Sequence, residues 1–134
     1  MLSRSEIYSV SNQKYWNKLW QNVNMSAKYG AAGARELKKA TLKKGHALLL
    51  TTEDLKDKWI EQGGKCYWLG IEMSLEDLMI SRSPFAVSVD RLDSQGEYTK
   101  DNIVLTTRFA NLGRGAYDAP DFKDRLTDLL QNRK

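Results

Sequence analysis

Four polar side chains in the C-terminal half of the chain could together carry phosphodiester chemistry. Asp90 and Asn111 supply the oxygen ligands that a hard divalent cation such as Mg²⁺ prefers. Arg91 and Arg114 are guanidinium cations, which grip phosphate through paired N–H donors. A hard metal ion among arginines, on a basic chain, predicts a protein that acts on nucleic acid.

These side chains need a hairpin and a helix to bring them together. The pattern predicts a strand over residues 86–92, a turn over 94–101, a second strand over 103–105 and a helix that starts at Thr106 or Thr107. A separation of 21 residues between Asp90 and Asn111 suits a hairpin that folds back and continues into a helix. We therefore expect the carboxylate and the carboxamide to converge on one cation.

The segment over 86–115, AVSVDRLDSQGEYTKDNIVLTTRFANLGRG, resembles the HNH endonucleases, or ββα-metal nucleases. Phage and mobile-element members of that family read SxDRID…GYT…NVVL…N..K. The matching residues here are Ser88, Asp90, Arg91, Leu92, Asp93, Gly96, Tyr98, Thr99, Asn102, Ile103, Asn111 and Arg114. Residues 51–73 resemble the helix and first hairpin strand that precede this motif, so the resemblance covers about half of the chain.

The resemblance implies an α+β fold with a ββα-metal core, additional N-terminal helices and a C-terminal helix. It implies that Asp90 and Asn111 hold Mg²⁺ (or Mn²⁺), with water and DNA phosphate oxygens completing the shell. Asn102 would tie the loop backbone together and so hold the first strand's active residue in place. Arg114 stands where relatives have Lys and is expected to bind phosphate. The chain has one cysteine, Cys66, and lacks the paired CxxC knuckles of zinc-binding relatives, so we expect no structural zinc.

The sequence departs from the family pattern at the general base. Arg91 stands at the position where most members carry His. An arginine stays protonated and is a very poor base. Arg91 could instead stabilise transition-state charge while hydroxide supplies the nucleophile. His46, the only histidine, or Tyr67 could act as the base. A catalytically degenerate site, which binds DNA without cutting it, is the fourth option.

Charge is divided unevenly along the chain. Residues 1–45 hold nine Lys or Arg and two Glu, a net +7, whereas the other 89 residues hold twelve basic and fifteen acidic side chains, a net −3. This asymmetry predicts a basic helical N-terminal arm over 1–45, joined to an HNH-like nuclease domain over 46–134. The side chains expected to contact nucleic acid are Arg35, Lys38, Lys39, Lys43, Lys44, Arg108 and Arg114.

Periodic apolar residues predict the remaining helices. A first helix follows Ser11, with Trp16 and Trp20 on an apolar face that favours core packing over base stacking. A second helix is predicted over 26–44. Thr51 should cap the N-terminus of a third helix, and Ser74 should cap a short helical turn. A last helix begins near Pro120, and its apolar side chains should pack on the body: Phe122, Leu126, Leu129 and Leu130.

The function that these patterns favour is a metal-dependent endonuclease of duplex DNA, either a phage homing enzyme or a small restriction-type enzyme. A homodimer would allow a concerted double-strand cut, because one ββα site cleaves one strand. The alternative is a non-catalytic nucleic-acid-binding module on the same scaffold. The lone cysteine and the absence of an apolar span near 20 residues predict a soluble, cytoplasmic protein, in the host cytoplasm if phage-encoded, with no membrane partner.

Overall fold

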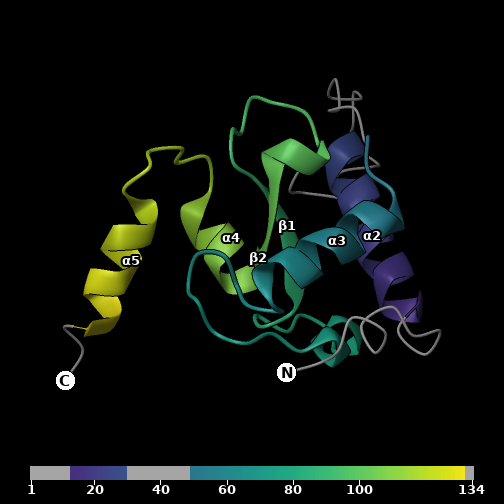
Figure 1. The fold of residues 1–134 in the computed structure, drawn as a ribbon, viewed down its shortest axis with the longest axis horizontal. Coiled ribbons are helices and arrows are strands. Elements are labelled where there is room, and N and C mark those ends of the chain that lie inside the picture. The colour runs from purple at the N-terminus through teal and green to yellow at the C-terminus, as the bar shows by residue number, and fades with distance from the viewer. Residues whose placement is uncertain (1–12, 30–48, 132–134) are drawn as a thin grey trace.

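Helices surround a two-stranded antiparallel hairpin in this mixed α+β fold, as the sequence predicts (Figure 1). The computed structural model describes residues 13–29 and 49–131. The elements are α2 (Gln13–Tyr29), α3 (Thr52–Gln62), the 3₁₀ helix η3 (Leu75–Met79), β1 (Val87–Arg91), the 3₁₀ helix η4 (Lys100–Asn102), β2 (Ile103–Thr107), α4 (Arg108–Arg114) and α5 (Phe122–Gln131).

Local hydrogen bonds fix where α3 begins and ends. The Thr51 hydroxyl accepts a hydrogen bond from the Asp54 N–H, and the Asp54 carboxylate accepts one from the Thr51 N–H, so the two residues form a capping box at the predicted cap. Gly63 ends the helix in the left-handed conformation with φ of 64°. A side-chain cap also begins η3, where the Ser74 hydroxyl accepts a hydrogen bond from the Glu76 N–H.

The hairpin and α4 form a continuous strand–strand–helix unit. Val87 pairs with Thr107 and Arg91 with Ile103 across the two strands. Thr107 then caps α4, because its hydroxyl accepts from the Ala110 N–H at 3.3 Å. The second strand is two residues longer than predicted, and the strand leads into the helix with no intervening loop.

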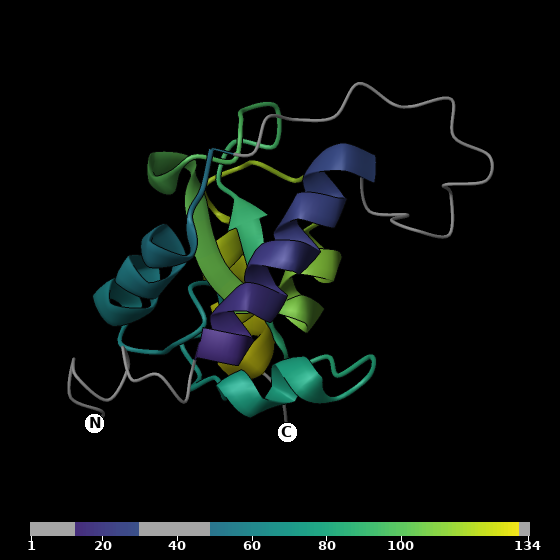
Figure 2. The ribbon, with the colours of Figure 1, turned by 90° about the vertical axis from the view of Figure 1, so that its right-hand side faces the viewer.

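The first helix belongs to the core and is longer than the sequence suggests. Trp16, Leu19, Val23 and Ala27 are all buried among side chains of α3, η3 and the hairpin. Figure 2 shows α2 crossing in front of the hairpin, which agrees with its packing against β1, α3 and η3. The predicted break near residue 26 is wrong, because Ala27 continues the buried stripe to the end of α2. The rest of the predicted helix, residues 30–44, lies outside the described residues, as does Ser11.

The end of the C-terminal helix does not pack as expected. Phe122 contacts Trp68, with ring centroids 5.1 Å apart, and Leu126 is partly buried. Leu129 and Leu130 are 70% and 50% exposed, so the prediction that they pack on the body is wrong. In Figure 1, α5 lies at one side of the molecule, away from the hairpin. In the described part of the chain, no helix is long and apolar enough to cross a bilayer.

We predict that Trp16→Ala lowers the free energy of unfolding by about 3–5 kcal/mol, because it opens a cavity where α2 meets α3. Trp16 is fully buried and meets Trp59 edge to face, with centroids 5.7 Å apart. Urea denaturation followed by circular dichroism measures the change. Leu129→Ala is the control and should cost less than about 0.5 kcal/mol, since that side chain is exposed. Equal effects of the two substitutions would contradict a core role for α2.

Candidate functional site

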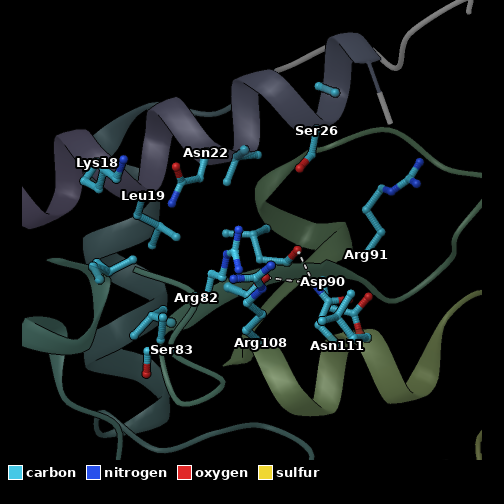
Figure 3. A pocket seen from close by; sticks show the side chains of 18 of the residues that line it. Lys18, Leu19, Asn22, Ser26, Arg82, Ser83, Asp90, Arg91, Arg108 and Asn111 are labelled. Carbon is cyan, nitrogen blue, oxygen red and sulfur yellow. Dashed lines mark hydrogen bonds between the residues drawn. The ribbon is translucent and has the colours of Figure 1, made fainter. Parts of the chain in front are cut away.

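A groove of about 1110 Å³ lies between α2 and α4, with β1 running between them (Figure 3). It gathers three of the residues that the sequence singled out as catalytic, namely Asp90, Arg91 and Asn111, and the first residue of α4, Arg108. Two further cations line it, Lys18 on α2 and Arg82 on the loop before β1. The ββα order of elements therefore places the predicted site residues on one surface.

Asn111 is held in one orientation by the strand next to it. Its Nδ2 donates to Ser88 Oγ at 2.8 Å and to the Val89 carbonyl at 3.3 Å, drawn as dashed lines in Figure 3. A carbonyl can only accept, so this contact fixes which end of the amide is nitrogen. The Oδ1 accepts no hydrogen bond from the described residues. An amide fixed in this way presents its oxygen as an available ligand.

Asp90 is a buried carboxylate with both oxygens engaged. Trp68 Nε1 donates to its Oδ2 at 2.8 Å, and Arg114 Nη1 donates to its Oδ1 at 2.8 Å. Burial raises the pKa of Asp90 above its ordinary value, and the hydrogen bonds from Trp68 and Arg114 oppose that rise. These two donors fix the orientation of the carboxylate that is expected to be the principal ligand.

Arg114 is not the phosphate-binding residue that the sequence predicts, and that assignment is wrong. Its side chain is 2% exposed and its guanidinium is occupied by partners within the protein. Besides Asp90, it donates to the Arg91 carbonyl, the Leu92 carbonyl and Asp118, each at 2.7 Å. A guanidinium enclosed in this way cannot meet a nucleic-acid backbone. Its role is to join α4 to the end of β1.

Arg91 faces the groove and is fixed by the hairpin turn. Its Nη1 donates to the Gly96 carbonyl at 3.0 Å, and its guanidinium lies 4.7 Å from the centre of the Tyr98 ring. The residue is only partly buried and lines the groove. This arrangement suits contact with an anion in the groove. It leaves no base at this position.

Asn102 ties the hairpin loop together, as the resemblance implies. Its Oδ1 accepts from the Asp93 N–H at 3.0 Å, and its Nδ2 donates to the carbonyls of Asp93 and Glu97. Gly96 is required beside it, since a Cβ there would lie 2.6 Å from the Asn102 Nδ2. Asn102 thus shapes the turn that carries Arg91 and acts through the backbone. The loop-tying role is confirmed, and any part in catalysis stays a prediction.

Several predicted residues do not belong to the groove or cannot be placed. Tyr67 is absent from its lining; its ring packs edge-on to Trp68, with Lys123 above it. This position gives no support to Tyr67 as the base. The predicted residues that lie outside the described ones are Arg35, Lys38, Lys39, Lys43, Lys44 and His46.

Two oxygen donors of the groove, the Asp90 carboxylate and the Asn111 Oδ1, are of the type that Mg²⁺ and Mn²⁺ prefer. In the described ranges, no three His, Cys, Asp or Glu side chains gather as a metal-binding group. Asp90 and Asn111 would then be the two protein ligands. Mg²⁺ commonly binds through one or two protein oxygens and keeps several waters. Hydrogen bonds to a ligating carboxylate are usual, and each Asp90 oxygen retains a lone pair beyond the one it uses here.

Sequence reasoning missed the residues that support this site. Trp68 and Asp118 complete the surroundings of Asp90 and Arg114, and Ser88 orients Asn111. One signal was available for Asp118, because it stands four residues after Arg114 near the end of the helix. Nothing in the sequence marks Trp68, which is 22 residues from Asp90.

No family model, curated protein or solved structure matches this chain.

We predict that Asp90→Ala lowers the free energy of unfolding by about 3–5 kcal/mol, because it leaves the buried Arg114 without its nearest counter-charge. Asp90→Asn keeps an oxygen for Arg114 and should cost clearly less. Asp118→Ala, which removes the more exposed partner of the same guanidinium, should also cost less than Asp90→Ala. Urea denaturation of the three variants measures the order. An Asp90→Ala protein as stable as wild type would show that the pair is not buried.

Proposed function

We propose that this protein is a metal-dependent DNA endonuclease of the HNH type, which hydrolyses phosphodiester bonds in duplex DNA. One observation carries the proposal. The strand–strand–helix unit places Asp90 and Asn111 on the wall of one groove, and Asn111 is fixed with its Oδ1 available. The ββα-metal core and the family resemblance are part of this proposal.

The charge of the groove supports nucleic acid as the substrate. Its lining includes four cations: Lys18, Arg82, Arg91 and Arg108. Among the described residues that line it, Asp90 is the only carboxylate, and it is already paired with Arg114. Phosphate contacts of this kind are sequence-independent and weaken steeply as salt increases. We therefore expect binding that tracks the DNA backbone.

Each site residue has a role that follows from its contacts. Asp90 and Asn111 would hold Mg²⁺, which when bound polarises the scissile phosphate and stabilises the leaving oxygen. Arg91, fixed by Gly96 and Tyr98, stabilises negative charge on the phosphate rather than accepting a proton. Trp68 and Arg114 orient Asp90 and do not touch the substrate.

A proton acceptor suited to neutral pH is missing from the described residues of the groove. Tyr98 lines it, but burial raises the pKa of its hydroxyl above the ordinary value, which leaves even less of it deprotonated and able to accept a proton at neutral pH. Solvent hydroxide, or His46, would then supply or generate the nucleophile. If hydroxide is the nucleophile, the cutting rate should keep rising with pH. If a histidine is the base, the cutting rate should level off above the pKa of the imidazole.

A catalytically degenerate nucleic-acid-binding protein is the second candidate. The observation that favours it is the ion pair between Arg114 and Asp90, which places a positive charge 2.8 Å from the expected ligand. A cation so close competes electrostatically with a metal ion. In that case the groove would bind nucleic acid with no requirement for a divalent ion.

We predict that purified protein nicks supercoiled plasmid with Mg²⁺ or Mn²⁺ and not with EDTA. Asp90→Asn and Asn111→Ala should each lower the rate by about 100-fold or more, because the first removes the negative charge of one metal ligand and the second removes the other ligand. Asp128→Asn on α5 and Asn17→Ala on α2 are matched controls outside the groove, and both should cut at the wild-type rate. Retardation of DNA without nicking, unchanged by EDTA, would favour the second candidate.

We predict that Arg91→His raises the cutting rate near neutral pH, since the scaffold would then present an imidazole where the family has its base. The rate of the variant should level off near the imidazole pKa, about 6.5, whereas the wild-type rate should keep rising with pH. Initial nicking rates measured across the pH range make the comparison. A wild-type plateau near that value, abolished by His46→Ala, would instead assign the base to His46.

A further inference from the structure

One wall of the groove combines exposed apolar side chains with cations. We call this wall the apolar–basic rim and define it by five residues, all of which line the groove: Met79, Ile80, Arg82, Arg108 and Leu112. Met79 and Ile80 are each 57% exposed and Leu112 is 66% exposed. Phosphate contacts alone would require cations and no apolar groups. The apolar members therefore need a second explanation.

Hydrogen bonds within the chain hold the loop of the rim in one conformation. Three successive turns form its loop, closed by backbone hydrogen bonds from Ile80 to Asp77, from Ser83 to Ile80 and from Ala86 to Ser83. The Ser83 side chain reinforces them, donating to Asp77 and accepting from the Phe85 N–H. The exposed side chains are thus presented by a hydrogen-bonded framework.

Backbone contacts join this loop to the start of α4. The Arg108 N–H donates to the Ala86 carbonyl, and the Phe109 N–H donates to the Pro84 carbonyl, each at 2.8 Å. Loop and helix therefore hold the two halves of the rim at a fixed spacing. Arg82 adopts a φ of 61°, an uncommon conformation for a residue other than glycine that costs free energy.

We infer that the apolar–basic rim contacts unpaired or unstacked bases, so that the preferred substrate is nucleic acid with an interruption in its duplex. The inference rests on the proposed role of the groove as a nucleic-acid site. A continuous duplex hides its base faces, whereas a bulge or a branch exposes them next to phosphates. Leu, Ile and Met are side chains that insert between base steps and unstack them, which costs least where the bases are already unpaired. The neighbouring arginines match the phosphates that accompany those bases.

Fluorescence anisotropy in EDTA, which prevents cutting, tests the inference with the full-length chain. The probes are a labelled duplex, the same duplex with a bulge of unpaired adenines, and a branched duplex. We expect wild-type protein to bind the bulged and branched probes about tenfold more tightly than the duplex. Leu112→Ser should remove most of that preference and leave duplex binding within about twofold of wild type, because the cations are unchanged.

Leu129→Ser is the matched control, since Leu129 is equally exposed but lies on α5 outside the groove lining. It should keep the full preference, and circular dichroism should show both variants folded. Equal wild-type affinity for duplex and interrupted probes overturns the inference, as does a Leu112→Ser variant that weakens all probes alike. A change in oligomeric state caused by Leu112→Ser, seen by size-exclusion chromatography without DNA, also overturns it and assigns the rim to contacts between copies.

Cutting measured on the same probes with Mg²⁺ separates the two proposals. Metal-dependent cutting without preference for interrupted probes would leave the endonuclease proposal standing and end the inference about substrate. A tenfold binding preference that Leu112→Ser removes, together with no cutting under any condition, would support the inference and contradict the proposed enzyme.

Discussion

The buried guanidinium of Arg114 is the interaction on which both the hairpin and the candidate site depend. It lies in α4 and pairs with Asp90 in β1 and with Asp118 beyond the helix, and it also donates to two carbonyls at the end of β1. A cation removed from water needs this many partners, since desolvation otherwise outweighs the attraction to one anion. The position of Asp90 is therefore set by the packing of the helix on the strand.

Trp68, which precedes the hairpin in the chain, also fixes the position of the Asp90 carboxylate. Its indole donates to Asp90, while Arg114 lies 5.0 Å from the centre of its ring and Phe122 meets it edge-on. One aromatic side chain thus contacts a strand, the helix after it and the start of α5. A change in any of these elements would reach the carboxylate through the indole. The contacts that stabilise the fold around Trp68 and Arg114 are therefore the same contacts that set the geometry of Asp90.

The local elements of the fold were predictable because their signals are local hydrogen bonds. The capping box at Thr51 and Asp54, the end of α3 at Gly63 and the cap of α4 at Thr107 each involve residues a few positions apart. The hairpin follows from two short β-branched runs around a turn, and the resemblance seen in the sequence pointed to the loop tie by Asn102. Such features depend little on the rest of the chain.

Contacts between residues far apart in the chain could not be predicted from the sequence. Arg114 reads as a surface cation until the position of Asp90, 24 residues away, is known. The stripe on α2 marks an apolar face but not the partner that buries it, and the exposure of Leu129 depends on where α5 leaves the body. In each case the residue type is compatible with both a buried and an exposed position, and the tertiary packing determines which of the two it occupies.

The Asp90–Arg114 pair also limits how strongly any metal ion can bind. A carboxylate that already shares its charge with a guanidinium attracts a divalent cation less than a free one does. Under the proposed function, phosphate oxygens of the nucleic acid must therefore supply much of the coordination, together with the Asn111 oxygen. Metal and nucleic acid would then raise each other's affinity by the same factor, as thermodynamic linkage requires. A protein built in this way would assemble its complete site only on its substrate, which confines hydrolysis to bound nucleic acid.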